Sequence, residues 1–298
     1  MDRILVPLDG SVVSEAILPM AEALARDYGA ELLLLRAVRA RTVPGSDALA
    51  LKRVGEAEAY LKRIANELQG RGLPRVRWSV GYAKPEQAIA EAAARNHVDL
   101  VAMTTHGRSG FGRLLLGSVA ESLVRQAPAP VLLVRGQPSW NPLGITKVLV
   151  PLDGSELSAA ILPVVERLAG PLDLSIVLLH VVEPLSPSAM AEVATRLEEM
   201  TALREADAEG YLSKVANDLQ AKGLRVRHEV RVGPAVDVIQ EFAQEEKIGL
   251  IAMTTHGRTG LGRLFFGSVA ERVVRAATVP VFLWKAREDS GSEDKASP

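Results

Sequence analysis

A segment of about 140 residues occurs twice in the chain, and this duplication constrains the fold more than any other feature of the sequence. The eight residues that begin at Ile4 return at Val148 with one conservative change, an offset of 144. Residues 104–121 return as residues 254–271, and 14 of these 18 positions are identical. The unit is too long for a solenoid repeat, so the sequence predicts two copies of one domain.

The copies are joined and followed by segments of different composition. Residues 136–144 are rich in turn-forming residues and predict a linker. We therefore expect domains at residues 1–136 and 145–286, and we expect the polar segment 287–298 to be a disordered tail. The offset grows to 151 at Ala57 and Ala208, so the second copy has the longer connection before this point.

Within each copy, short apolar runs alternate with stretches of helical periodicity. The first copy predicts strands at residues 3–8, 31–38, 76–80, 98–103 and 130–135, and helices at 11–29, 47–69, 86–95 and 118–126. Almost continuous apolar strands are typical of a parallel sheet with helices on both faces. We therefore expect an α/β protein with two tandem open parallel five-stranded sheets, each in a Rossmann-like domain.

In such sheets, ligands bind beyond the carboxyl ends of the strands, where the strand order reverses. Asp9 and Asp153 follow the first strand of each copy, and Thr104 and Thr254 follow the fourth. A carboxylate in this place can accept hydrogen bonds from ribose hydroxyls or hold a metal ion on a phosphate. The alternative is an Asp-Gly turn that only helps to start the next helix, and the residues alone leave both interpretations open.

A glycine-rich loop follows the fourth strand at residues 107–118 and again at 257–268. Glycines let an anion approach backbone N–H groups, and Gly117-Ser118 precedes a predicted helix whose N-terminus favours phosphate. Arg108 and Arg113 can add charge-assisted hydrogen bonds. The pattern is not a Walker A loop, because no Gly-Lys-Ser/Thr occurs. It predicts a phosphate-binding loop, and the alternative is a surface loop followed by a serine N-cap.

Composition excludes several classes of function. The chain has no cysteine, which excludes disulfides, thiolate catalysis and iron–sulfur clusters. A net charge of −1 and 4% aromatic residues argue against a nucleic-acid partner. No apolar run reaches the roughly 20 residues of a membrane span, and the first residues do not read as a secretory signal. We expect a cytoplasmic protein with no membrane partner.

The motifs together resemble those of the universal stress protein family. The resemblance rests on residues 6–11, on Met103-Thr104-Thr105-His106-Gly107 and on Gly117-Ser118, and the second copy repeats it. The ATP-binding branch of that family carries Gly-x2-Gly-x9-Gly-Ser/Thr. The last two parts of this pattern are present here, whereas Thr104 and Thr254 replace its first glycine. The sequence thus looks like a tandem member of the ATP-binding branch.

This resemblance implies a set of nucleotide-binding residues in each copy. Asp9 would contact the ribose, Ala37 the adenine through its backbone, and the residues around Gly117 the phosphates. The implied residues of the first copy are Pro7, Leu8, Asp9, Ala37, Met103, Thr104, Gly107, Arg108, Gly117, Ser118 and Val119. Those of the second copy are Pro151, Leu152, Asp153, Val181, Met253, Thr254, Gly257, Arg258, Gly267, Ser268 and Val269.

The function implied by the resemblance is that of an ATP-binding regulatory or stress-response protein, with ADP or AMP as other candidate ligands and Mg²⁺ with the phosphates. A slow ATPase is the alternative, and a structural module without ligand is a third hypothesis. We assign no catalytic residue and no metal site. A hydrogen bond or phosphate contact is favoured over a general-base role for His106 and His256. The run from Glu192 to Glu209 predicts a solvated helical face, with a lid over the site as the less favoured interpretation.

Family domains pair through their last strands, which here are residues 130–135 and 280–284. The resemblance therefore implies that the two copies pair with each other inside one chain, which would cover two exposed sheet edges. Further association into a homodimer remains open, and the sequence identifies no protein partner.

Overall fold

The fold comes from a computed structural model, which describes the whole chain except residues 40–46, 106–115, 136–144, 185–191, 256–266 and 286–298. The predicted linker and tail lie outside the described residues. The N-terminal half contains β1 (Arg3–Pro7), α1 (Val12–Glu15), α2 (Leu18–Tyr28), β2 (Glu31–Ala37), α3 (Asp47–Gly70), β3 (Val76–Gly81), α4 (Pro85–Arg95), β4 (Leu100–Thr104), α5 (Ser118–Gln126) and β5 (Val131–Val134).

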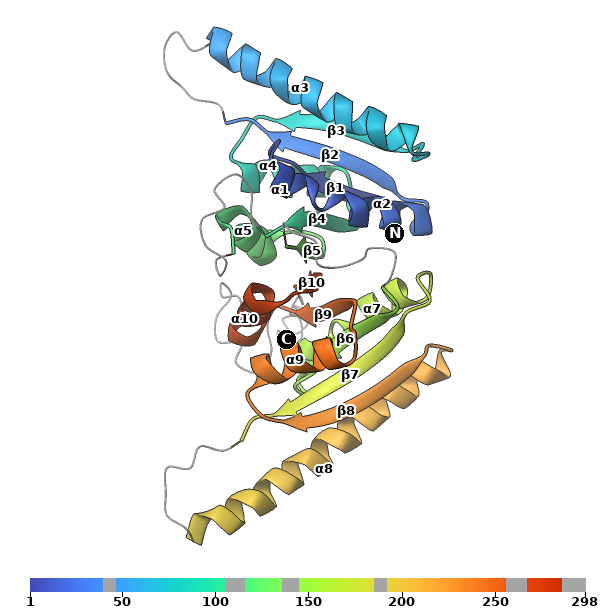
Figure 1. The fold of residues 1–298 in the computed structure, drawn as a ribbon, viewed down its shortest axis with the longest axis vertical. Coiled ribbons are helices and arrows are strands. Elements are labelled where there is room, and N and C mark those ends of the chain that lie inside the picture. The colour runs from blue at the N-terminus through green and yellow to red at the C-terminus, as the bar shows by residue number, and fades with distance from the viewer. Residues whose placement is uncertain (40–46, 106–115, 136–144, 185–191, 256–266, 286–298) are drawn as a thin grey trace, which may run out of the picture.

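The C-terminal half repeats this order of elements (Figure 1). It contains β6 (Lys147–Pro151), α6 (Glu156–Ala159), α7 (Leu162–Ala169), β7 (Ser175–Val182), α8 (Glu192–Ala221), β8 (Val226–Val232), α9 (Ala235–Glu245), β9 (Leu250–Thr254), α10 (Ser268–Ala276) and β10 (Val281–Trp284). Each strand and helix expected from the first copy is present, and most boundaries agree within two residues.

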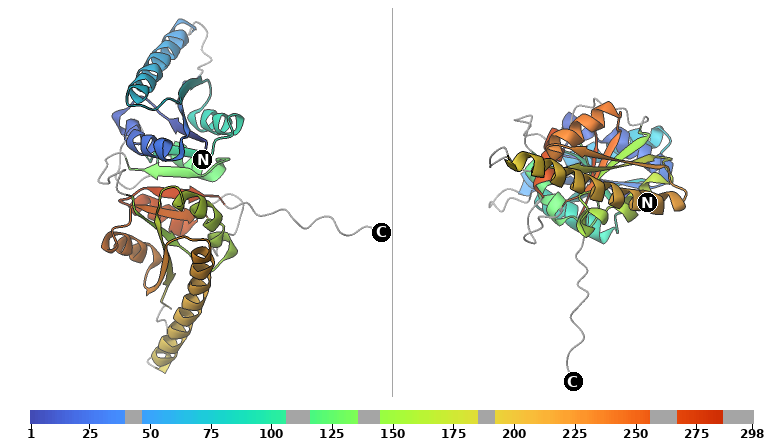
Figure 2. Two further views of the ribbon diagram at one scale, coloured as in Figure 1. Left: turned by 90° about the vertical axis from the view of Figure 1, so that its right-hand side faces the viewer. Right: turned by 90° about the horizontal axis from the view of Figure 1, so that it is seen from below.

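The α/β prediction is confirmed, with one refinement of the sheet. The ten strands in the described part of the chain belong to one sheet with the order β3-β2-β1-β4-β5-β10-β9-β6-β7-β8. The strands are parallel within each half, and β5 pairs with β10 in antiparallel register, with Leu132 opposite Phe282. Lone edge strands would expose unpaired N–H and C=O groups, and this pairing satisfies them. The two five-stranded sets therefore merge at the middle of an elongated molecule, with α3 and α8 at opposite ends (Figures 1 and 2).

Helices cover both faces of the sheet because successive strand residues point to opposite sides. In β1, Ile4 belongs to the core cluster that also contains residues of α2 and α3, such as Leu24 and Leu61. Its neighbour Leu5 belongs to the second cluster, which contains residues of α4 and α5. This alternation buries most side chains of the central strands, whereas the edge strands β3 and β8 are largely exposed or half-buried.

The predicted helix at residues 11–29 is divided into α1 and α2. Ser11 is the N-cap as expected, and its Oγ accepts a hydrogen bond of 3.1 Å from the N–H of Ser14. The interruption lies just before Pro19, which has no N–H to continue the helical hydrogen bonds of α1. Gly29 ends α2 with φ of 61°, the left-handed conformation that glycine adopts most easily.

Candidate functional site

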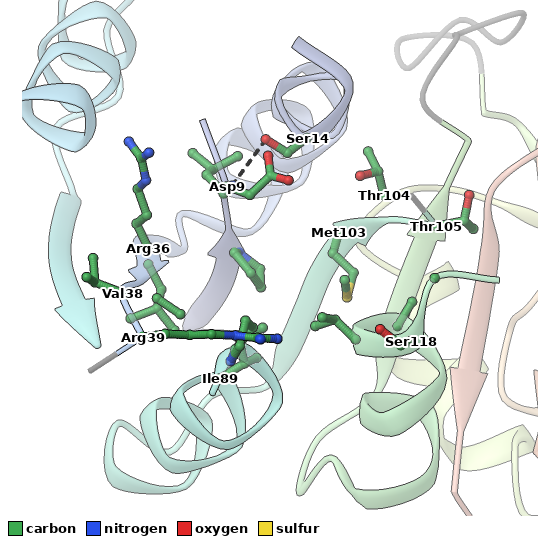
Figure 3. Close-up of a pocket in the computed structure, with 18 of the residues that line it drawn as sticks. Asp9, Ser14, Arg36, Val38, Arg39, Ile89, Met103, Thr104, Thr105 and Ser118 are labelled. Carbon is green, nitrogen blue, oxygen red and sulfur yellow. Dashed lines mark hydrogen bonds between the residues drawn. The ribbon is translucent and has the colours of Figure 1, made fainter. Parts of the chain in front are cut away.

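A pocket of about 670 Å³ opens at the carboxyl ends of β1, β2 and β4, beside the N-terminus of α5 (Figure 3). The strand order reverses here, since β1 lies between β2 and β4. Small-molecule sites commonly enclose roughly 300–1,000 Å³ and occur at this kind of switch point. The pocket has both the position and the size of a ligand site.

The pocket gathers every predicted site residue of the first copy that the structure describes. Those that line it are Pro7, Leu8, Asp9, Ala37, Met103, Thr104, Gly117, Ser118 and Val119. They come from three strand ends and one helix start that are distant in sequence. Gly107 and Arg108 lie outside the described residues, as do Arg113 and His106.

Asp9 has a structural role in addition to its place in the pocket. Its Oδ1 accepts hydrogen bonds from the N–H of Ser11 at 2.9 Å and from the Oγ of Ser11 at 2.6 Å. These bonds fix the serine that caps α1, so the turn interpretation describes a real contact. The same carboxylate lines the pocket, which keeps it in the place where a ribose hydroxyl could bind.

The start of α5 differs from the alternative interpretation of a serine N-cap. Gly117 is the N-cap, with extended backbone angles and no side chain to satisfy the first N–H groups of the helix. Its own N–H donates to the carbonyl oxygen of Thr105 at 2.8 Å, which ties the helix start to the end of β4. Ser118, the first residue of α5, is exposed and lines the pocket. The positive end of the α5 dipole thus adjoins the pocket.

The prediction missed three arginines at the pocket rim. Arg36 and Arg39 come from the end of β2 and the residues after it, and Arg53 comes from α3. Figure 3 shows Arg36 and Arg39 on the side of the pocket opposite Thr105 and Ser118. Within the described part of the chain, none of the three forms an ion pair. A comparison of the two copies beyond their identical segments could have shown this difference, because the second copy lacks two of these arginines.

Tyr60 of α3 supports Arg36. The Arg36 guanidinium lies 5.0 Å from the centre of the Tyr60 ring, a cation–π distance. The phenol donates a 2.9 Å hydrogen bond to Oε1 of Glu15. Burial and this hydrogen bond raise the pKa of Tyr60, so its ring is neutral at physiological pH. Gly10, with φ of 84°, leaves room here, because a Cβ at this position would lie 3.1 Å from the guanidinium.

The C-terminal half repeats the central part of this arrangement. Oδ1 of Asp153 accepts from the N–H of Ser155 at 3.0 Å and from its Oγ at 2.6 Å. Gly267 is the N-cap of α10 and donates to the carbonyl of Thr255 at 2.7 Å. The predicted residues at the corresponding strand and helix ends are Pro151, Leu152, Asp153, Val181, Met253, Thr254, Gly267, Ser268 and Val269. Gly257 and Arg258 lie outside the described residues, as do Arg263 and His256.

The rim of the second site is different. His180 stands where the first half has Arg36, and only 8% of its surface is exposed. Arg204, the counterpart of Arg53, donates a 2.9 Å hydrogen bond to the carbonyl oxygen of Glu183. The carboxylate of Glu183 accepts from the N–H of Ala235 at 3.4 Å, at the start of α9. Glu183 itself is the counterpart of Arg39.

The described residues contain no group of three or more histidine, aspartate or glutamate side chains that could hold a metal ion. His228 contacts Oε1 of Glu209 at 2.8 Å. Side chains on α8 from Glu198 to Glu209 are mostly exposed, in agreement with a solvated helical face. Among the described helices, none combines the length and the apolar character needed to cross a membrane.

Comparison with known proteins identifies the fold family. The model of the universal stress protein family matches the sequence twice, at residues 1–135 and 144–285. The chain belongs to the universal stress protein family. It is a tandem member, since the two matches together span almost all of its length.

Individual universal stress proteins resemble the chain over one copy or both. One from Methanocaldococcus jannaschii is 32% identical and covers 47% of this chain and 81% of its own length. One from Synechocystis is 24% identical and covers 96% of this chain and 100% of its own. The crystal structure of one from Archaeoglobus fulgidus has a TM-score of 0.71 at 21% identity, with 95% and 98% of the two chains covered. The last likeness shows that the tandem arrangement of the fold is shared.

Proposed function

We propose that this universal stress protein binds adenine nucleotides and regulates a stress response through its nucleotide-bound state, with ATP as the main ligand and ADP or AMP as further candidates. One observation carries the proposal. The pocket of about 670 Å³ brings together Asp9, the end of β2 and the N-terminus of α5, whose N-cap Gly117 has no capping side chain, as a ligand with a ribose, a base and phosphates requires.

In this proposal each part of the ligand has its own residues. The carboxylate of Asp9 accepts hydrogen bonds from ribose hydroxyls, and the backbone around Ala37 meets the adenine beside Met103. The N–H groups at the start of α5, with the hydroxyl of Ser118, bind phosphate oxygens. Gly107 and Arg108 extend the phosphate site from the adjoining loop. We propose the equivalent roles in the second copy for Asp153, Val181, Met253, Gly257, Arg258, Gly267, Ser268 and Val269.

Magnesium would enter with the phosphates. The described residues offer no cluster of carboxylates for a dedicated ion site. Mg²⁺ usually keeps several waters and binds through substrate phosphates with one or two carboxylates. We therefore place Mg²⁺, where it binds, on the phosphate oxygens of the ligand. The proposal assigns no catalytic residue. It includes domain limits at residues 1–136 and 145–286 and a cytoplasmic location.

The test begins with the purified chain. Denaturation should release an adenine nucleotide that absorbance and chromatography can identify. Calorimetric titration of the emptied protein with ATP should then give binding heat, and ATP should raise the melting temperature, because a ligand that binds only the folded state stabilises it. No binding heat and no thermal shift at millimolar ATP would contradict the proposal.

A further inference from the structure

Among the described residues, the two candidate sites differ most in charge near the end of the second strand of each half. Their phosphate loops carry arginines at the same positions, Arg108 and Arg113 in the first copy and Arg258 and Arg263 in the second. The aspartates after β1 and β6 make the same pair of hydrogen bonds to the next serine. The difference among the described residues lies at the end of the second strand and on the long helix that follows it.

On the rim of the N-terminal pocket, cations outnumber anions. Arg36, Arg39 and Arg53 line this pocket, and its carboxylates are Asp9 and Glu56. The three guanidinium groups have no carboxylate partner within the described residues. Arg36 is held over the Tyr60 ring at 5.0 Å, so its position is fixed without its charge being neutralised. An unpaired arginine at a partly enclosed pocket attracts anionic ligands.

At the C-terminal positions that correspond to the N-terminal rim, anions outnumber cations. His180 replaces Arg36, Glu183 replaces Arg39, and Asp207 stands in the place of Glu56. Arg204 is the one arginine retained, and it donates to the carbonyl oxygen of Glu183. The helical segment that carries Arg204 and Asp207 is therefore fastened to the end of β7. These C-terminal positions thus carry a net negative charge, whereas the N-terminal rim carries a net positive one.

We propose that the two sites are selective for ligand charge: the N-terminal pocket takes a nucleoside polyphosphate, and the C-terminal site takes an adenine ligand with fewer phosphates. This inference rests on the proposed function, since it assigns different ligands to sites that the proposal treats alike. Its physical basis is Coulombic attraction across the pocket and not direct contact, because Arg36 and Arg39 lie opposite the helix start that is proposed to bind the phosphates. This attraction grows with the number of ligand charges and weakens with salt.

Arg39 could also act by stacking on the base, which is a cation–π contact and not a charge effect. The two explanations separate cleanly. A stacking contact changes the affinity for adenosine and for ATP by the same factor, whereas a charge effect acts on ATP, weakly on AMP, and hardly on adenosine. Salt distinguishes them as well, since only the charge effect is strongly screened.

The experiment titrates the full chain with ATP, AMP and adenosine at low and high salt and compares four proteins: the unmodified chain, Arg39→Glu, Glu183→Arg and Lys52→Glu. Lys52 is the control, because it is exposed on α3 beside Arg53 and does not line the pocket. The unmodified chain should show two classes of ATP site. Arg39→Glu should weaken the tighter class about tenfold or more at low salt, and Glu183→Arg should tighten the weaker class by a similar factor.

Lys52→Glu should change either class less than about twofold, since an exposed charge away from the ligand is screened. Melting curves of the variants confirm that each one folds. The same ATP-to-AMP preference at both sites, or an equal loss of adenosine and ATP binding in Arg39→Glu, would overturn the charge inference while the proposed function stands. A chain that binds none of the three ligands would instead contradict the proposed function itself.

Discussion

At the turn after the first strand, the two halves of the chain agree in detail. The hydroxyl of Ser11 donates to Asp9 at 2.6 Å, and the hydroxyl of Ser155 donates to Asp153 at the same distance. Beside the edge strands the halves diverge. A groove of about 540 Å³ lies between β3 and α4, and Ala92 is one of the residues that line it. The C-terminal counterpart of Ala92 is Phe242, whose ring is buried.

This divergence shows which parts of a duplicated domain are free to change. The strand-to-helix turns are fixed by short-range hydrogen bonds that involve neighbouring residues, so substitution there affects the backbone itself. The rim and the edge depend on side chains that one helix presents to one strand, and these can change without moving the sheet. In the C-terminal half the Arg227 and Arg231 guanidinium groups lie 5.7 and 5.6 Å from the Phe242 ring. The edges thus reach similar folds by different packing.

We expect the largest effect on the free energy of unfolding from substitutions at Phe242 and at its counterpart Ala92. Phe242→Ala removes a buried aromatic ring and its two cation–π contacts, and should lower the free energy of unfolding by about 3–5 kcal/mol. Ala92→Phe should change it by less than about 1.5 kcal/mol, since the groove of about 540 Å³ has room for a ring. Urea denaturation measures both, with hydrogen exchange to separate the two halves. Equal effects would mean that the groove is not the counterpart of the Phe242 packing.

The next comparison separates the two roles of the site aspartates. Asp9→Asn keeps an oxygen that accepts from Ser11 but loses the negative charge, whereas Asp9→Ala loses both. If the carboxylate binds ribose, Asp9→Ala should weaken nucleotide binding at one site by tenfold or more, about the loss expected of a charged hydrogen bond. Asp153→Ala should do the same at the other site, and calorimetric stoichiometry shows which site is lost. A variant that lowers the melting temperature without weakening nucleotide binding would mean that the aspartate only stabilises the turn.

Much of the fold could be predicted from the sequence because its signals are local. Apolar runs such as residues 3–8 mark buried strands, and Ser11 and Gly29 mark helix ends. The same holds for the centre of the candidate site, where Asp9, Thr104 and Gly117 each follow or precede a predicted element. Parallel strands bring their carboxyl ends to one edge, so the position of each residue in its element was enough to place them together.

The rim arginines and the single sheet were harder to predict because they depend on distant contacts. Arg53 lies on a long helix, and only the packing of α3 beside the end of β2 brings it near Arg36. A periodicity pattern does not say which turn of a helix reaches a pocket. The joining of β5 to β10 was implied by the family resemblance and not by the residues themselves. The division of residues 11–29 into two helices occurs at Pro19, because proline has no N–H to donate to the preceding turn.

A smaller effect should come from the helix N-caps that face the sites. Gly117→Ala adds a methyl group where phosphate is proposed to approach the backbone, and an alanine N-cap is less favourable than glycine. We expect a loss of binding of about three- to tenfold at the N-terminal site alone, with Gly267→Ala acting on the other. Calorimetry of both variants checks this. Loss at both sites from one substitution would show that the two halves are coupled in binding.

The smallest difference is expected where the halves agree best, at the serines that cap α1 and α6. Ser11 and Ser155 each accept a 3.1 Å hydrogen bond from the N–H three residues later. Replacement by alanine should cost about 1 kcal/mol in each half, the usual value for a lost N-cap, and the two costs should agree within about 0.5 kcal/mol. Urea denaturation followed by local hydrogen exchange measures each cost. Equal stability costs would show that the turns around the two aspartates contribute equally to the free energy of unfolding, so that unequal ligand binding must come from the rim. A clear inequality would place part of the asymmetry in the turn itself, and the charge difference at the rim would then explain only the remainder.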